Sequence, residues 1–363
     1  MDLLRIVSMY MIVLLHSGSH GGTLAIEEGV SFYTILFHFI EALTICSVNV
    51  FVLISGYFLC TQAFRPSRII KTVIAVVFYS MIWILVSAIM LKDPISLKDI
   101  IRALLPISYK QYWFISAYVG MYLLSPLLNA FLKNITQVQH IAFIIILMAV
   151  FSLWPDVVIG SNPLGIVGRG HTIIWFMVLY VVASFFRLYP IKIDPKITLG
   201  LYFFTAILLV LIWLLIALFT KANSFENEVQ GMMTFYYFRY NSLLVFISAI
   251  SLFLTFLDLK IMNVQIQKFI KIIAPLTLGV YLIHDNVIAR GIVWDGMRYL
   301  EPTPITPLYV LGYTISIFVL CLIIDKIRLL LFSVINKNSW YISKIQAIDR
   351  LPNRTKIYIQ NYL

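Results

Sequence analysis

The chain has 363 residues, of which 61% are hydrophobic and 12% charged, and its formal net charge is +11. Soluble domains carry about 25% charged residues, so this composition excludes a soluble globular protein and indicates one that crosses a membrane several times. The positive charge requires no nucleic-acid partner, because basic loops that anchor a membrane protein to anionic lipid headgroups account for it.

Ten apolar segments recur along the chain, in the range of lengths needed to cross a hydrocarbon core of about 30 Å. They cover residues 2–16, 34–59, 69–91, 112–132, 139–159, 172–190, 198–219, 237–257, 272–290 and 307–332. The joins between them are too short to hold a soluble domain. We therefore predict an all-α, polytopic membrane protein of about ten transmembrane helices, with one transmembrane domain over residues 1–332 and a basic cytoplasmic tail over residues 333–363.

The distribution of lysine and arginine predicts which side of the membrane each loop occupies. With the N-terminus inside, eighteen of the 27 basic residues fall on the inner side, whereas ten of the 16 acids fall in outer loops. Both termini are therefore predicted to be cytoplasmic. The loop at residues 92–111 is basic although it is predicted outside, and its spacing is typical of a helix lying on the membrane surface. Because the first segment begins abruptly at Met1, we expect the true start to lie slightly upstream.

The first apolar segment contains two residues that are costly to bury, Arg5 and His16. Helix geometry places side chains eleven positions apart within roughly 20° of one face and about 16 Å apart along the axis. A cation near one end and a proton-transfer group near the other can bind the two ends of one long ligand. The alternatives are that Arg5 snorkels to the inner headgroups and that His16 merely ends the helix at headgroup level.

Arg65 and Arg68 follow the second segment, three positions apart on the predicted inner side. Two planar guanidinium groups at this spacing can bind a phosphate through paired hydrogen bonds. The alternative is that they are ordinary positive-inside anchors.

The second segment contains His38 and Glu41, which share one helical face. Glu41 is the only acid deep in an apolar segment, so it either orients His16 or His38 as an acid partner or neutralises a buried arginine. Asn49 and Ser55, farther along the same segment, are expected to form hydrogen bonds between helices.

Polar and aromatic side chains gather at the predicted outer ends of several other segments. They are Trp113, Arg169, His171, Tyr240, His284 and Asp285. Such groups suit a sugar ring, so we predict an outward-opening glycan-binding cleft around His16, with Trp113, Arg169 and His284 as substrate-binding residues. The alternatives are that the aromatic residues belong to the interfacial belt and that His284 is satisfied by a backbone carbonyl.

Several stretches resemble acyltransferase family 3. The opening Asp-Leu-Leu-Arg-Ile at residues 2–6 with His16, and Phe-Val-Leu-Ile-Ser-Gly-Tyr-Phe at residues 51–58, are its most specific elements together with the basic pair that follows. Arg65-Pro66-Ser67-Arg68 is similar to the family's RxxR element, Tyr112 to Asn129 to its fourth-span signature, and Gly279 to His284 to its late-span signature. The likeness covers nearly the whole chain, although the family's few residues before the opening stretch and the extracytoplasmic domain of longer members are missing.

The resemblance implies a multi-pass enzyme of the bacterial cell membrane that moves an acyl group, usually acetyl from acetyl-CoA, onto surface carbohydrates. We expect Arg5, Arg65 and Arg68 to engage acetyl-CoA from the cytoplasm, with no metal. The acceptor is expected to be a surface polysaccharide, such as capsule or another exopolysaccharide, or its lipid-linked precursor, with polysaccharide-assembly proteins and membrane lipids as further partners. An acceptor still facing inward would fit a cytoplasmic site equally well.

Transfer from a thioester to a sugar hydroxyl needs a base, and an imidazole suits that task. His16 is the candidate base and Glu41 the second candidate catalytic residue. The alternative function is a polysaccharide export component without acyl transfer. Because a transporter needs a continuous polar path, whereas this chain concentrates its ionisable groups at two levels of its first two spans, the sequence favours the enzyme.

Overall fold

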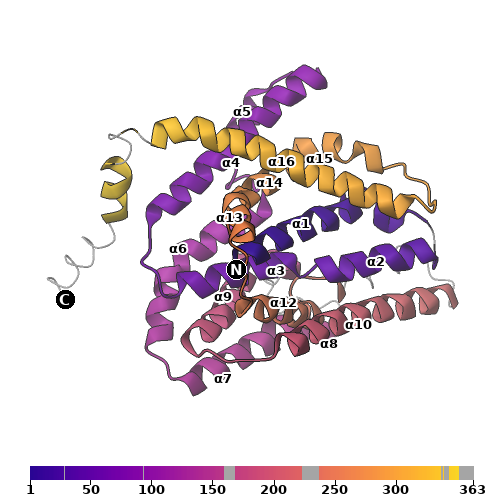
Figure 1. Cartoon of the computed structure of the whole chain (residues 1–363), viewed down its shortest axis with the longest axis horizontal. Helices are drawn as coiled ribbons and strands as arrows, with labels where there is room; N and C mark the ends of the chain where they lie inside the picture. Colours follow the sequence, from indigo (N-terminus) through magenta and orange to yellow (C-terminus); the bar gives the residue numbers. More distant parts are fainter. Residues whose placement is uncertain are drawn as a thin grey trace.

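The computed structural model describes residues 1–27, 29–92, 94–158, 168–222, 237–336, 338 and 343–350. Over these residues the chain is helical and contains no strand (Figure 1), which confirms the all-α prediction.

The first four elements place the first predicted span at the centre of the bundle. They are α1 (Asp2–Ser19), the short 3-10 helix η1 (Thr23–Ala25), α2 (Phe32–Thr44) and α3 (Ser47–Leu59). Helix α1 contacts α2, α3, α14 and α16, and it lies between α16 and α10 in Figure 1. The predicted second span is therefore two helices in one apolar run, and α1 extends three residues beyond its predicted end at His16.

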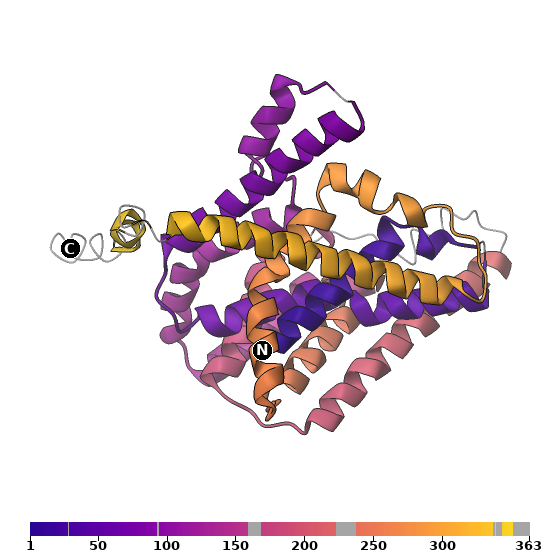
Figure 2. The same ribbon diagram turned by 45° about the horizontal axis from the view of Figure 1, so that its top comes forward.

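The next elements run outward from this centre. They are α4 (Pro66–Met90), α5 (Leu97–Leu104), α6 (Trp113–Lys133), α7 (Gln137–Met148), the π-helical turn η2 (Ala149–Leu153) and α8 (Trp154–Val157). Proline at the first position of α4 and a capping box of Ser96 and Asp99 at α5 explain why these helices begin where they do. Helix α5 and the end of α4 stand out from the rest of the bundle (Figure 2), so the helix expected within residues 92–111 is present.

The remaining elements complete the bundle around α1. They are η4 (Gly168–Gly170), α9 (Ile173–Leu188), α10 (Pro195–Ala222), α12 (Leu243–Leu257), α13 (Val264–Ile273), η5 (Ala274–Leu276), α14 (Thr277–His284), α15 (Val287–Val293), η6 (Asp295–Met297) and α16 (Thr306–Asn336). The predicted span 272–290 is divided after His284, because the Asn286 side chain accepts a hydrogen bond from the Ile288 amide and starts α15. This break positions Asp285 between two helices.

Among the residues that the structure describes, six helical runs are long and apolar enough to cross a membrane. They are Phe32–Leu59, Pro66–Met90, Trp113–Lys133, Gln137–Val157, Pro195–Ala222 and Val264–His284. Two shorter apolar helices, Ile173–Leu188 and Leu243–Leu257, accompany them. The chain is thus a helical membrane protein, while the total of ten spans and the cytoplasmic side of both termini stay predictions.

A buried polar cluster joins α14 to α4 and α16. Asp325 is fully buried and accepts hydrogen bonds from Tyr79 Oη and Arg328 Nε, each over 2.7 Å. A Cβ atom at Gly279 would overlap the Asp325 carboxylate, so only glycine allows α14 to approach so closely. Since an intramembrane charge is stable only when it is paired, this cluster holds the helix that carries His284 in a defined position.

Asn49 joins three segments, as the sequence predicts. Its Nδ2 donates to the Tyr240 carbonyl over 2.6 Å, and its Oδ1 accepts from Trp175 Nε1 over 3.0 Å. The Ser55 hydroxyl donates to the Phe51 carbonyl one turn earlier in its own helix, and it also interacts with the hydroxyl of Tyr118 on α6.

Candidate active site

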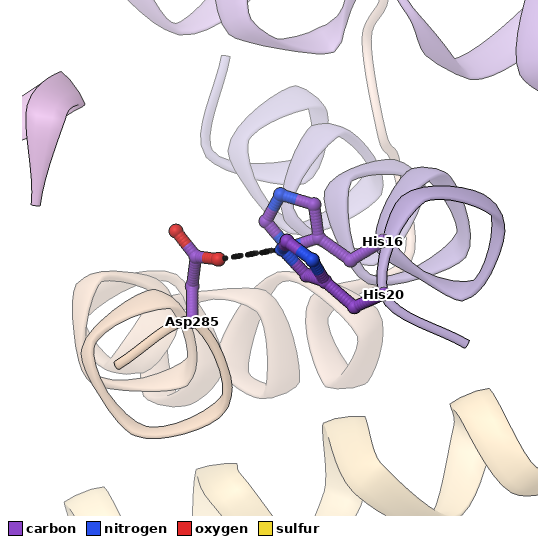
Figure 3. Close-up of side chains that lie close together, drawn as sticks. All are labelled: His16, His20 and Asp285. Atoms are coloured by element: carbon purple, nitrogen blue, oxygen red, sulfur yellow. Dashed lines mark hydrogen bonds and ion pairs between the residues drawn. The ribbon is translucent and has the colours of Figure 1, made fainter. Parts of the chain in front are cut away.

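Two helix ends bring a cluster of titratable side chains together. His16 lies in the last turn of α1 and His20 follows one turn later, while His284 ends α14 and Asp285 follows it. His16 Nδ1 lies 2.9 Å from His284 Nε2 and 3.7 Å from Asp285 Oδ1. Figure 3 shows the imidazoles of His16 and His20 on one side of the Asp285 carboxylate, and His20 Nε2 lies 3.1 Å from Asp285 Oδ1.

The hydrogen bonds determine which nitrogen of His16 is basic. His284 Nδ1 lies 2.6 Å from the Val280 carbonyl oxygen, which can only accept, so Nδ1 carries the proton. With a neutral His284, Nε2 then accepts and His16 Nδ1 donates to it. The lone pair of His16 is therefore on Nε2, which makes no hydrogen bond within the described residues.

Asp285 supplies a buried negative charge behind His16. Its side chain is 1% exposed, and its Oδ1 accepts from Arg290 Nε over 3.0 Å as well as from His20. At 3.7 Å from His16 Nδ1, this carboxylate stabilises the imidazolium ion that forms when His16 takes up a proton.

The cluster also contains a possible set of metal ligands. The nearest donor atoms of His16, His20 and Asp285 all lie within 4.8 Å of one another, and two imidazoles with one carboxylate are a zinc-type set. However, Arg290 already donates to the same carboxylate oxygen, and His16 Nδ1 already bonds His284. These existing hydrogen bonds favour acid-base chemistry at the cluster.

A cavity of about 510 Å³, here the Arg5 cavity, runs along α1 and contains both Arg5 and His16 in its wall. At one end Arg5 pairs with Asp2 and lies over the ring of Phe58. Arg5, Asp2 and Lys271 belong to the lining of the cavity, and Phe58 does not. The wall between the two ends is mainly apolar. Its apolar members are Met9, Ile12, Val48, Phe51, Phe114, Ile115, Ala274, Pro275 and Leu278. Arg5 and His16, which the sequence predicts to bind the two ends of one ligand, thus line one continuous cavity.

A second cavity of about 700 Å³, here the Glu41 cavity, lies beyond His16. Helix α2 presents Thr34, His38 and Glu41 to it as one stripe, as helical spacing predicts. His38 donates from Nδ1 to the Thr34 carbonyl over 2.8 Å, and its ring stacks on Trp213 with centroids 4.1 Å apart. Within the described residues the Glu41 carboxyl group makes no hydrogen bond or ion pair, so it does not orient His16 or His38. The acid near His16 is Asp285.

Three arginines face the Glu41 cavity. Arg290 pairs with Asp285, and Arg239 pairs with Asp156 over 2.7 Å. The third, Arg169, adopts a left-handed φ of 56° between two glycines of η4. The predicted substrate-binding residue Arg169 therefore does lie at a cavity, whereas His284 lines neither cavity and lies behind His16.

His16, Trp113 and Tyr240 line both cavities. The rings of Trp113 and Tyr240 are stacked, with centroids 5.5 Å apart and planes at 24°. Any group held against these three residues is accessible from both sides. This shared wall is the point at which two ligands can meet.

Arg65 and Arg68 lie at the start of α4 and line neither cavity. Arg68 donates to Gln62, and Thr72, one turn farther along α4, is in the lining of the Arg5 cavity. Arg68 is therefore one helical turn from a residue of that lining, and neither arginine forms part of the wall. Ser67 lies between the two arginines in the sequence, and its backbone amide and hydroxyl donate hydrogen bonds to Asp349 of the tail.

The sequence contained signals for most of this site. It singled out Asp285, but gave no reason to place it beside His16. His20 follows His16 by four positions and so shares its face, which is a signal that was missed. Arg290 offered none, because its position depends on the break after His284.

Fold and site together define a helical membrane protein in which the His16 imidazole lies between two cavities. The family model described as an acyltransferase domain, that of acyltransferase family 3, matches residues 1–326. The chain therefore belongs to this family and is a membrane acyltransferase. No match was found among curated proteins or among solved structures.

Proposed function

We propose that the protein transfers an acyl group, acetyl in the simplest case, from cytoplasmic acyl-CoA to a hydroxyl group of a bacterial surface polysaccharide or its lipid-linked precursor. The observation that carries this proposal is that His16, Trp113 and Tyr240 line both cavities. A donor in one cavity and an acceptor in the other would reach the same imidazole.

The Arg5 cavity has the chemistry that an acyl-CoA requires. Arg5 and Lys271 provide positive charge at one end for phosphate groups, and the mainly apolar wall suits the uncharged arm that carries the thioester. Arg65 and Arg68, at the start of α4, offer further guanidinium groups for the nucleotide portion. The thioester would then lie beside His16.

The Glu41 cavity has the chemistry that a sugar requires. The carboxyl group of Glu41 has no hydrogen-bond partner within the described residues, so it is available to bond the hydroxyl groups of a sugar. Trp113 and Tyr240 offer aromatic faces, and Arg169 offers further donors at the same cavity. These groups support a carbohydrate acceptor.

The chemistry follows from the proton positions. His16 Nε2 removes the proton of the acceptor hydroxyl while its oxygen attacks the acyl carbon. The new C–O bond forms, the C–S bond to coenzyme A breaks, and His16 returns the proton to the departing sulfur. Asp285 stabilises the positively charged His16 between these two proton transfers. His284 holds the proton on His16 Nδ1 in place.

The test compares O-acetyl content of the surface polysaccharide in cells with the intact gene, a deletion, His16→Ala and His140→Gln. His140 is a matched control because it is a buried histidine that bonds the Val181 carbonyl and lines neither cavity. We expect loss of the ester in the deletion and His16→Ala strains only, with equal membrane abundance of both variants and continued polymer export. Unchanged acetylation with polymer trapped inside the deletion strain would instead indicate an export component.

A further inference from the structure

Three segments that are distant in the sequence bring aromatic rings together at and beside the wall shared by the two cavities. Trp113 begins α6, His171 precedes α9, and Tyr240 precedes α12. The His171 ring lies 4.2 Å from that of Trp113 and 4.8 Å from that of Tyr240, centroid to centroid. The three rings thus form one aromatic block, of which Trp113 and Tyr240 line both cavities together with His16.

This aromatic block is held from behind. The Tyr240 carbonyl accepts the Asn49 amide at 2.6 Å, and a Cβ atom at Gly170 would lie 2.7 Å from Tyr240 Cβ. Trp113 packs against Phe176, whose ring is fully buried. Because close-packed interiors resist displacement, the rings cannot move aside to admit a larger group at little cost.

An acyl group undergoing transfer would lie against this wall. Its carbonyl carbon must lie beside His16, with the coenzyme A arm in the Arg5 cavity and the acceptor in the Glu41 cavity. A long chain would have to fold back along the arm, enter the space of the acceptor or occupy the position of the rings. Only a short acyl group avoids all three.

We propose that the stacked Trp113 and Tyr240 rings set the length of the acyl group, admitting acetyl and similarly short groups and rejecting long ones. This inference rests on the proposed function. The bonds formed and broken are those of the transfer described above, and the two rings act by contact with the moving group.

The test measures kcat/KM for acetyl-, butyryl- and octanoyl-CoA with purified protein and a carbohydrate acceptor. We expect wild type to prefer acetyl over octanoyl strongly, and Trp113→Ala and Tyr240→Ala to reduce that ratio at least about tenfold, mainly by a gain with octanoyl-CoA. Trp113→Leu keeps more bulk and serves if the alanine variants do not fold, with a smaller change expected in the same direction.

Two controls change one cavity at a time. Phe51→Ala widens only the Arg5 cavity and Trp213→Ala only the Glu41 cavity, so neither should change the chain-length ratio as much as the wall variants. Equal use of octanoyl and acetyl by wild type, or an unchanged ratio in folded wall variants, overturns the inference while leaving acyl transfer intact. Absence of transfer from every donor by folded wild type overturns the proposed function itself.

Discussion

His16 donates from Nδ1 to Nε2 of His284 over 2.9 Å, although 268 positions separate the two residues. Because His284 in turn donates to the Val280 carbonyl, the backbone of α14 selects the tautomer of a histidine on α1. The nitrogen left basic is the one that can act on a ligand.

Removing this hydrogen bond should impair catalysis more than binding. In His284→Ala the Nδ1 proton of His16 loses its acceptor, so a substantial fraction of His16 would carry its proton on Nε2. We expect kcat to fall by about 10²-fold with the KM for donor little changed. His284→Gln, which keeps a side-chain acceptor, should retain more activity. Steady-state kinetics decide the matter, and full activity in both variants would show that His284 only packs.

Neutralising Asp285 should have an effect of similar size. Asp285→Asn keeps the shape but removes the charge that stabilises protonated His16, and it leaves Arg290 without its ion pair. We expect kcat to fall by about 10²- to 10⁴-fold. Asp156→Asn is the matched control, because that carboxylate also pairs with an arginine at the Glu41 cavity and lies behind Arg239 instead of His16. Equal losses in the two variants would indicate a structural role.

Glu41 should govern the acceptor and leave the donor unaffected. Glu41→Gln keeps the shape and one acceptor oxygen but replaces the second oxygen with an amide group that can only donate hydrogen bonds. We expect the KM for acceptor to rise several-fold while the KM for acyl-CoA is unchanged. Initial rates with each substrate varied in turn separate the two constants. A matching rise in the KM for donor would contradict the assignment of the cavities.

How much of this site the sequence predicts depends on whether a relationship lies within one helix. Arg5 and His16 line one cavity, and His38 and Glu41 another, because helical periodicity alone fixes which side chains share a face. The contact of His16 with Asp285 lies between helices that meet only after folding, so the sequence offered Glu41, the nearer acid along the chain, instead. The periodicity of each helix does not indicate which residues of two different helices will meet.

The same reasoning applies to the helix boundaries. Hydropathy predicts an uninterrupted span over residues 272–290, but one side-chain cap at Asn286 divides it and exposes Asp285 to the site. A single polar residue changes the mean hydropathy of a span only slightly. The helix break that it causes nevertheless positions Asp285.

The start of α4 is occupied by the tail. Ser67 donates from its backbone amide and its hydroxyl to the two oxygens of Asp349, over 3.0 and 2.7 Å. Helix N-termini favour anions, and Arg65 and Arg68 flank this one. If coenzyme A phosphates bind here, Asp349→Ala should lower the KM for acyl-CoA several-fold with kcat unchanged, and Arg350→Ala should not. An unchanged KM in Asp349→Ala would place the phosphates elsewhere, at Arg5.

The close approach of α14 to α16 predicts a difference between two glycines. A methyl group in Gly279→Ala would overlap the fully buried Asp325 and disturb its bonds to Tyr79 and Arg328, so we expect about 1–3 kcal/mol of destabilisation. Gly312→Ala on α16 meets nothing within 4 Å and should be neutral or slightly stabilising, because alanine favours the helix. Thermal unfolding of the two purified variants in one detergent gives the comparison.

Because Gly279 also positions the helix that ends at His284, its variant should lose activity as well. A stable and fully active Gly279→Ala protein would show that α14 can shift without disturbing His16.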